Sequence, residues 1–182
     1  MPALHLGELR RRTLNAVLPA GVTSLSLSRG TSAGRKFQYL VTQQEWELVL
    51  EGPPSAAMIV VTAQRGGTIR ETLAIAKAYV EARKLHGQSE LLDEIVAAKP
   101  EVDHARYHSR EELEQHVLQH LRAAITLLER KAEPDEVKAY RRFVLALADK
   151  VANAHRDGGP AVSEAERAAI DEISASLSNP SS

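Results

Sequence analysis

Apolar residues recur at intervals of three and four positions along most of this chain, which is the spacing of one face of an α-helix. The pattern is clearest over about 110–132 and 135–155. The expected inward positions there are Leu113, Val117, Leu121, Ala124, Ile125 and Leu128, followed by Val137, Tyr140, Val144, Leu147, Ala148 and Val151. Because only a short junction with Pro134 joins the two segments, we predict two long helices packed as antiparallel neighbours.

Shorter helices are predicted on either side of this pair, at about 43–51, 69–85, 90–98 and 164–177. In the segment at 69–85, the residues expected to face inward are Ile69, Leu73, Ala76 and Val80. In the last segment, the expected inward residues are Ala165, Ala169, Ile170, Ile173 and Leu177.

The stretch at 56–63 is ambiguous, because its β-branched residues suit a strand while its flanks suit a buried helix. Its candidate partner strands, at 22–28 and 37–41, are weak, so we predict a helix. Pro53 and Pro54 are expected to end the helix at 43–51, with Pro54 at the first position of the next one.

Four predicted helix starts carry a Ser or Thr followed three positions later by Glu, the capping-box pattern. The pairs are Thr42 and Glu45, Thr68 and Glu71, Ser109 and Glu112, and Ser163 and Glu166. Together with the apolar periodicity, they predict an all-α fold, a bundle of about six to seven helices.

The first 40 residues differ from the rest, because they hold six basic side chains and one acidic, and 22–36 is rich in Ser, Thr and Gly. We predict a flexible, poorly ordered basic segment at 1–40 and a single helical domain at 41–178. Three interpretations of the segment stay open: a disordered tail, translated sequence upstream of the true start, or a targeting segment in which Arg11-Arg12 hints at twin-arginine export. We expect a cytoplasmic protein, with export or targeting through residues 1–40 as the alternative.

Composition excludes several function classes. The chain has no cysteine, which rules out disulfides, thiolate zinc sites, iron–sulfur ligation and cysteine nucleophiles. Residues 41–182 hold 17 basic and 23 acidic side chains, without the basic excess of a nucleic-acid-binding core. No apolar run approaches the roughly 20 residues that span a bilayer. We therefore expect no nucleic-acid partner and no transmembrane segment.

The motifs of common enzyme classes are missing from the sequence. It holds no dinucleotide-binding G-x-G-x-x-G, no P-loop and no H-E-x-x-H. One G-x-S-x-G occurs at 30–34, but it lies in the Ser/Gly-rich stretch without the buried strand that a nucleophile elbow needs. The sequence therefore favours a protein without catalytic activity.

Glu112, His116 and His120 are spaced four positions apart, which places them on one side of the helix predicted at 110–132. Histidines at this spacing can chelate a transition metal ion through neutral imidazole nitrogens. The alternative is the polar border of an amphipathic helix, with His120 near the core edge and His116 nearer solvent.

A second candidate metal site follows the helix predicted at 135–155. Asp157, Glu164 and Glu166 flank a turn with two glycines, and their oxygens, with backbone carbonyls, suit Ca²⁺ or Mg²⁺. A purely structural interpretation also explains these residues, since the Asp-Gly pair makes a turn and Ser163 with Glu166 caps the last helix.

This region resembles the TerB-like family, whose members are small helical bundles associated with tellurite resistance and with metal or envelope stress in bacteria. The resemblance rests on an Ala-rich helix, Asp157-Gly158, Val162-Ser163, Glu166, Ile170 and Ile173, over about 135–177. The chain departs from the family pattern at His155-Arg156, where Ala-rich and acidic residues are usual. The resemblance implies a metal-linked stress response with Asp157, Glu164 and Glu166 as candidate residues. The chain is also similar to small bacterial helical proteins that carry no known activity.

Two functions compete at this point. The first is a non-enzymatic interaction or scaffold protein, with a stress-related role, which binds a protein partner or a second copy of itself and needs no cofactor. The alternative is a metal-binding stress-response protein that holds a divalent ion through His116 and His120 or through the Asp157 turn. The first function predicts an exposed apolar patch or a homodimer face on the bundle.

Overall fold

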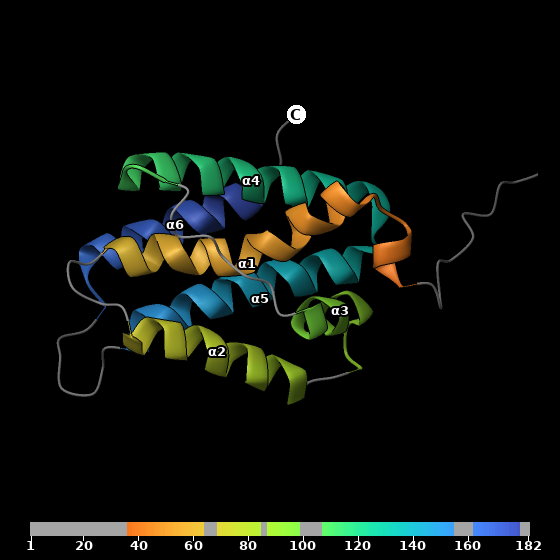
Figure 1. Cartoon of the computed structure of the whole chain (residues 1–182), viewed down its shortest axis with the longest axis horizontal. Helices are drawn as coiled ribbons and strands as arrows, with labels where there is room; N and C mark the ends of the chain where they lie inside the picture. Colours follow the sequence, from red (N-terminus) through yellow and green to blue (C-terminus); the bar gives the residue numbers. More distant parts are fainter. Residues whose placement is uncertain (1–35, 64–68, 85–86, 99–106, 155–161, 179–182) are drawn as a thin grey trace, which may run out of the picture. The chain divides into compact units, whose positions relative to one another are not determined.

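The computed structural model describes residues 36–63, 69–84, 87–98, 107–154 and 162–178. Over these residues the chain forms six α-helices, one turn of 3-10 helix and no strand (Figure 1). Their bounds are η1 Phe37–Tyr39, α1 Gln43–Ala63, α2 Ile69–Lys84, α3 Glu90–Ala98, α4 Arg110–Lys131, α5 Pro134–Asn153 and α6 Glu164–Ser178. The predicted all-α bundle is confirmed. The prediction of a poorly ordered segment falls almost wholly on residues 1–35, outside the described part.

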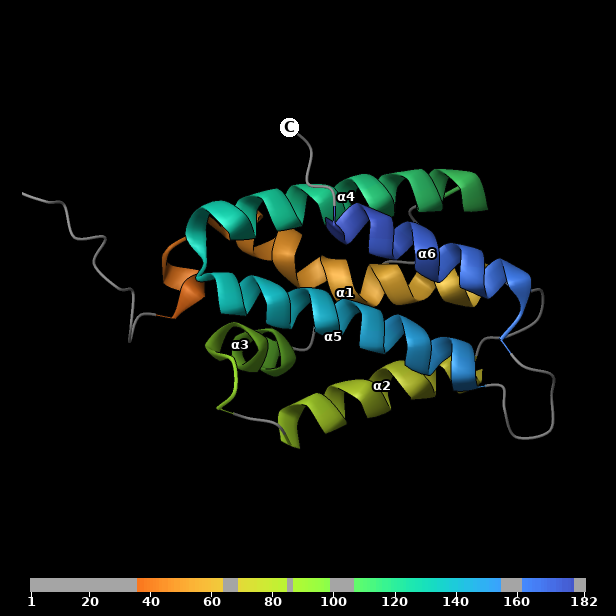
Figure 2. The ribbon, with the colours of Figure 1, turned by 180° about the vertical axis from the view of Figure 1, so that it is seen from behind.

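Helix α1 is the centre of the bundle, because it contacts each of the other five α-helices. Figures 1 and 2 show α4 and α6 on one side of it and α5 on the other, with α2 and α3 outside α5. The buried apolar side chains of α1 are Trp46, Val49, Ala56, Ala57, Ile59 and Val60. A helix surrounded by others must bury more than one face, and this explains why 56–63 lacks a polar stripe.

Helix α1 runs unbroken from Gln43 to Ala63, so the predicted end at Pro53-Pro54 is wrong, whereas the predicted helix at 56–63 is confirmed. Proline normally breaks a helix, because it has no N–H to donate and its ring crowds the carbonyl four residues back. Here a neighbouring helix offsets part of the loss, since Tyr140 of α5 donates to the carbonyl oxygen of Val49, which the N–H missing from Pro53 would have reached. His120 of α4 adds a bond to the carbonyl oxygen of Leu48 in the same turn.

The inward rows predicted for α4 and α5 are confirmed at every position. In α4 these buried residues are Leu113, Val117, Leu121, Ala124, Ile125 and Leu128. In α5 they are Val137, Tyr140, Val144, Leu147, Ala148 and Val151. Both segments have charged residues on the opposite face, so the apolar stripe alone decides which side is buried.

Two capping boxes form as predicted at α1 and α6, and the α4 cap differs in one bond. At α1, Thr42 Oγ1 accepts from the amide of Glu45 at 3.2 Å, and the Glu45 carboxylate accepts from the amide of Thr42 at 2.8 Å. At α4, Ser109 caps Glu112 as expected, but the Glu112 carboxylate binds the amide of His108 instead of that of Ser109. The cap predicted at Thr68 lies outside the described residues.

Helix α2 presents to the bundle a face other than the predicted one. Leu73 and Val80 were expected inside, yet they are 55% and 52% exposed. Ala76, between them on the same side of the helix, is exposed as well. The predicted inward row of α2 is therefore wrong for these three residues.

The face of α2 that packs on the bundle is centred on Ala78 and Tyr79. The ring of Tyr79 meets that of Phe143 of α5 edge to face, with centroids 5.3 Å apart. An aromatic side chain buries more apolar area than Leu or Val, and an edge-to-face pair adds a favourable ring–ring interaction. Since both faces of α2 are apolar, burial of the Tyr79 ring explains why the face with Tyr79, and not the face with Leu73 and Val80, packs on the bundle.

Helix α3 is held at both ends by side chains from other helices. At its N-terminus, Glu136 of α5 accepts from the amides of Glu90 and Leu91, at 3.1 and 3.2 Å. At its C-terminal end, Arg83 of α2 donates to the carbonyl oxygen of Val96 through Nε and Nη2, at 2.9 and 2.6 Å. These bonds satisfy backbone groups that a helix of nine residues leaves open at its ends.

The folded part begins before residue 41, where the sequence placed the boundary. Phe37 is buried, and its ring lies 6.3 Å from that of Trp46. The carboxylate of Glu94 in α3 accepts from the amides of Phe37 and Gln38, at 2.8 and 3.0 Å. The turn η1 is therefore fixed to α3 by contacts that are distant in sequence.

Candidate functional site

His120 of α4 binds the backbone of α1. Its Nε2 lies 2.7 Å from the carbonyl oxygen of Leu48. A carbonyl oxygen accepts hydrogen bonds and cannot donate one, so Nε2 carries the proton in this contact. His120 lies at the core edge and is half-buried, as predicted. Its Nε2 is hydrogen-bonded to the backbone of α1, so this nitrogen is not open to a metal ion.

Tyr140 of α5 binds the next carbonyl. Its hydroxyl donates to the oxygen of Val49 at 3.0 Å, and the side chain is fully buried. Pro53 lacks the N–H that would normally reach Val49, so Tyr140 replaces the missing helical donor. Burial, with a smaller contribution from nearby Tyr79, raises the pKa of Tyr140 well above its usual range. The phenol is therefore neutral and able to donate.

Gly52 makes room for this contact. A Cβ at position 52 would collide with the hydroxyl oxygen of Tyr140 and come within 3.4 Å of Leu121. Glycine thus allows the phenol to reach the backbone of α1 beside Pro53. The sequence shows this glycine and the prolines side by side, but their partner lies 91 residues from Val49 in sequence.

His116 and Glu112 lie on the same side of α4, one and two turns before His120. His116 is exposed, with its ring 6.2 Å from that of His120 and 5.4 Å from that of Tyr107. The Glu112 carboxylate binds the amide of His108 at 2.9 Å. The rings of His116 and His120 therefore lie next to each other, whereas Glu112 binds the backbone before the helix.

The second predicted metal site is described only in part, because Asp157 lies outside the described residues. Glu164 is exposed, whereas Glu166 is 2% exposed. The Glu166 carboxylate accepts from the amide and the hydroxyl of Ser163, at 2.8 and 2.9 Å. Positions two apart on a helix do not face each other, so these two carboxylates do not point into one site.

No group of three or more His, Asp or Glu side chains within the described ranges is arranged to hold a metal ion. Between α4 and α6, the hydrogen bond between the carboxyl groups of Glu114 and Glu172 raises the pKa of Glu114, and partial burial of Glu114 raises it further. The metal-binding hypothesis stays a prediction, and nothing in this geometry adds to it.

The exposed apolar side chains of α2 form the most unusual surface of the described part. We call Leu73, Ala76 and Val80 the outer face of α2; they are spaced i, i+3 and i+7, so they form one stripe along the helix. Leu73 and Val80, with Tyr39 on η1, are the exposed large hydrophobic residues among those described. Two such side chains on one stripe need an explanation that scattered ones do not.

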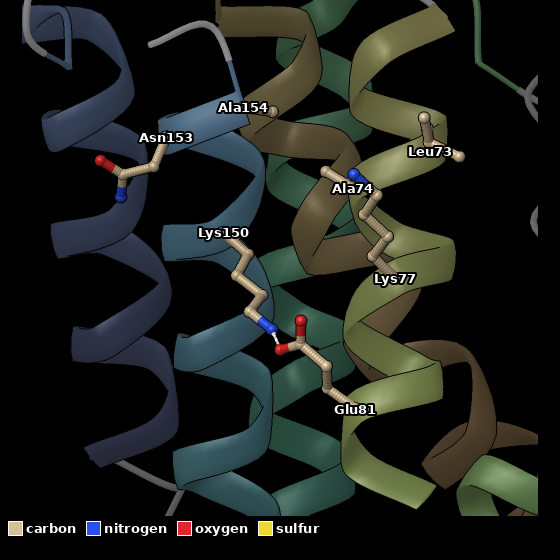
Figure 3. A pocket seen from close by; sticks show the side chains of 7 residues that line it. All are labelled: Leu73, Ala74, Lys77, Glu81, Lys150, Asn153 and Ala154. Carbon is tan, nitrogen blue, oxygen red and sulfur yellow. Dashed lines mark ion pairs between the residues drawn. The ribbon is translucent and has the colours of Figure 1, made fainter. Parts of the chain in front are cut away.

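A cavity of about 440 Å³ lies beside this stripe, between α2 and the C-terminal end of α5 (Figure 3). Its lining residues are Leu73, Ala74, Lys77 and Glu81 of α2, with Lys150, Asn153 and Ala154 on the α5 side. Figure 3 shows Glu81 and Lys150 reaching across the gap to form an ion pair. Leu73 belongs to both the outer face and the cavity, which makes the two surfaces continuous.

The residues of this surface are visible in the sequence as an apolar row, but their exposure is not. The sequence shows the stripe of Leu73, Ala76 and Val80 as apolar, but its periodicity predicts an inward position that the structure does not have. A second apolar row in the same segment, at Ala74, Ile75, Ala78, Tyr79 and Ala82, could have indicated that one of the two rows would remain outside.

Comparison with known proteins gives no match, since neither a family model, a curated protein nor a solved structure is significantly similar to this chain. The likeness to the TerB-like family therefore stays a resemblance of a short pattern. Among the described helices, none is long and apolar enough to cross a membrane.

Proposed function

We propose that this chain is a non-enzymatic interaction protein that binds a protein partner through the outer face of α2. The observation that carries the proposal is the exposure of Leu73 and Val80, at 55% and 52%, on a helix that already buries its other apolar face. When a partner covers apolar side chains and removes them from water, the free energy of the complex falls by about 25 cal/mol for each Å² of apolar surface covered.

The arrangement of α2 supports this role. It lies at the outside of the bundle, against α5 and α3, and is anchored by the ring of Tyr79 and by Arg83 (Figures 1 and 2). An outer helix fixed along one side can present the opposite side without a change in the core. Helix-in-groove binding uses an apolar stripe of this i, i+3, i+7 spacing.

Site-specific photo-crosslinking in the native cells tests the proposal. Leu73 and Val80 are replaced, one at a time, by p-benzoylphenylalanine, and Arg142 on the exposed side of α5 is replaced as a control. We expect one discrete adduct, of the same mass from both α2 positions and identified as protein by mass spectrometry, with no adduct from position 142. Absence of an adduct from α2, or equal labelling from all three positions, contradicts the proposed function.

A further inference from the structure

We infer that the partner of the outer face of α2 is an acidic amphipathic helix, whose apolar side chains cover Leu73, Ala76 and Val80 and whose carboxylates meet Lys77 and Lys84. This inference rests on the proposed function and specifies its partner.

The charges beside the stripe are predominantly basic. Of the four charged residues of α2 from Leu73 onward, Lys77, Arg83 and Lys84 are basic and Glu81 is acidic. Glu81 is paired with Lys150 of α5, so its charge is offset. Lys77 and Lys84 form no ion pair with any described residue. This basic flank stands out, because residues 41–182 together hold more acidic than basic groups.

The spacing of these residues matches one side of a two-helix interface. Leu73 and Val80 are seven positions apart, Ala76 lies between them at the second apolar position of a heptad, and each large apolar residue is followed four positions later by a lysine. In coiled coils, the charged residues next to the apolar seam choose the partner and its orientation through ion pairs. A helix with glutamates beside its own seam complements Lys77 and Lys84.

A second copy of α2 is a poorer occupant of the same face. An antiparallel pair of identical helices brings equivalent flanking positions together, so the lysines of one copy meet those of the other. Like charges held next to each other oppose association. In a parallel pair, the opposite flank would have to supply the acidic group, but Tyr79 stands there and is buried against Phe143.

The cavity between α2 and α5 offers a place for one carboxylate of the partner. It is continuous with the stripe through Leu73, and Lys77 lines it (Figure 3). Its volume of about 440 Å³ accommodates side chains from an approaching helix. The Glu81–Lys150 ion pair lies along the wall of the cavity, and Lys77 is the lining cation that forms no ion pair with a described residue.

The test uses the full chain and two synthetic three-heptad helical peptides with identical apolar seams. One peptide carries Glu at the positions that flank the seam, and the other carries Lys. We expect fluorescence anisotropy to show at least about tenfold tighter binding of the acidic peptide in low salt, with the difference reduced in high salt. Lys77→Glu combined with Lys84→Glu should reverse the preference, whereas the matched charge reversal Arg142→Glu should leave it unchanged.

The other outcomes overturn the inference in distinguishable ways. If neither peptide binds and sedimentation shows a dimer that Leu73→Glu dissociates, the occupant is a second copy, and the docking function survives without the acidic partner. If both peptides bind equally, the lysines play no part. If the chain binds anionic phosphatidylglycerol vesicles through Leu73 and neither peptide, both this inference and the proposed protein-binding function fail. Circular dichroism checks that each variant keeps its helices.

Discussion

The imidazole Nε2 of His120 lies 2.7 Å from the carbonyl oxygen of Leu48, so a side chain of α4 binds the backbone of α1 just before its two prolines. Replacement of His120 by Ala removes this side-chain donor from a partly buried contact. We expect the free energy of unfolding, measured by urea denaturation, to fall by about 1–3 kcal/mol. His116→Ala, on the exposed side of the same helix, should change it by less than about 0.5 kcal/mol. Equal effects of the two variants would show that the His120 contact contributes nothing specific.

Tyr140 and Gly52 should be energetically coupled. Tyr140→Phe removes the donor to Val49 and is expected to lower the free energy of unfolding by about 1–2 kcal/mol. Gly52→Ala introduces a Cβ that collides with the hydroxyl of Tyr140, so it should also destabilise. In the double variant the colliding atom is gone, and we expect a loss smaller than the sum of the two single losses. Additive losses in this double-mutant cycle would contradict the close approach.

Removal of the Tyr79 hydroxyl should change the free energy of unfolding in the direction opposite to removal of the Tyr140 hydroxyl. Its hydroxyl is buried and has no hydrogen-bond partner among the described residues. Burial also raises the pKa of Tyr79 well above its usual range, so the group stays neutral at physiological pH. Removal of an unsatisfied buried hydroxyl relieves a desolvation penalty, and we expect Tyr79→Phe to raise the free energy of unfolding by up to about 1 kcal/mol. A loss comparable to that of Tyr140→Phe would indicate that the hydroxyl has a partner.

Glu45 should make the protein lose stability as the pH falls into the acid range. Its carboxylate lies 2.8 Å from Lys131 Nζ, and this bond, followed by that to the amide of Thr42, lowers the pKa of Glu45 from 4.5 to about 2. A carboxyl group with a lowered pKa in the folded state stabilises that state above pH 4.5 and loses this effect as the pH falls to about 2. We expect wild type to lose more stability than Glu45→Gln over this range of pH in urea titrations.

The control for this pH dependence is Asp135→Asn. Asp135 pairs with Lys138 on the surface, where its side chain is 93% exposed, and such pairs contribute little. The free energy of unfolding of Asp135→Asn should therefore vary with pH in the same way as that of wild type. If the profile of Glu45→Gln also follows wild type, the contact between Glu45 and Lys131 does not form in solution.

Metal content separates the remaining interpretations of the histidines. Nε2 of His120 is engaged by Leu48, and His116 is exposed, so we expect the pair to retain no stoichiometric divalent ion. Elemental mass spectrometry of protein equilibrated with a panel of divalent ions measures this. One ion per chain that is lost in His116→Ala would establish the metal-binding alternative, and one that is lost in Asp157→Ala would place the site at the turn before α6.

The sequence by itself determined the elements that are governed by local interactions. The stripes of α4 and α5 could be predicted because each of these helices has one apolar face and one charged face. The starts of α1, α4 and α6 could be predicted because a cap is made by side chains within three or four residues of the backbone they bind.

Only the tertiary structure decided the path of α1 and the orientation of α2. Pro53 ends a helix when its neighbours are considered alone, but Tyr140 replaces its missing donor to Val49, and His120 adds a bond to Leu48, both from helices far away in sequence. Helix α2 has two apolar faces, so periodicity could not decide between them, and the packing of the Tyr79 ring against Phe143 selected the one that is buried. The exposed stripe at Leu73 and Val80 follows from that choice. Contacts of this kind depend on which side chains the fold brings together, and no local pattern in a sequence contains that information.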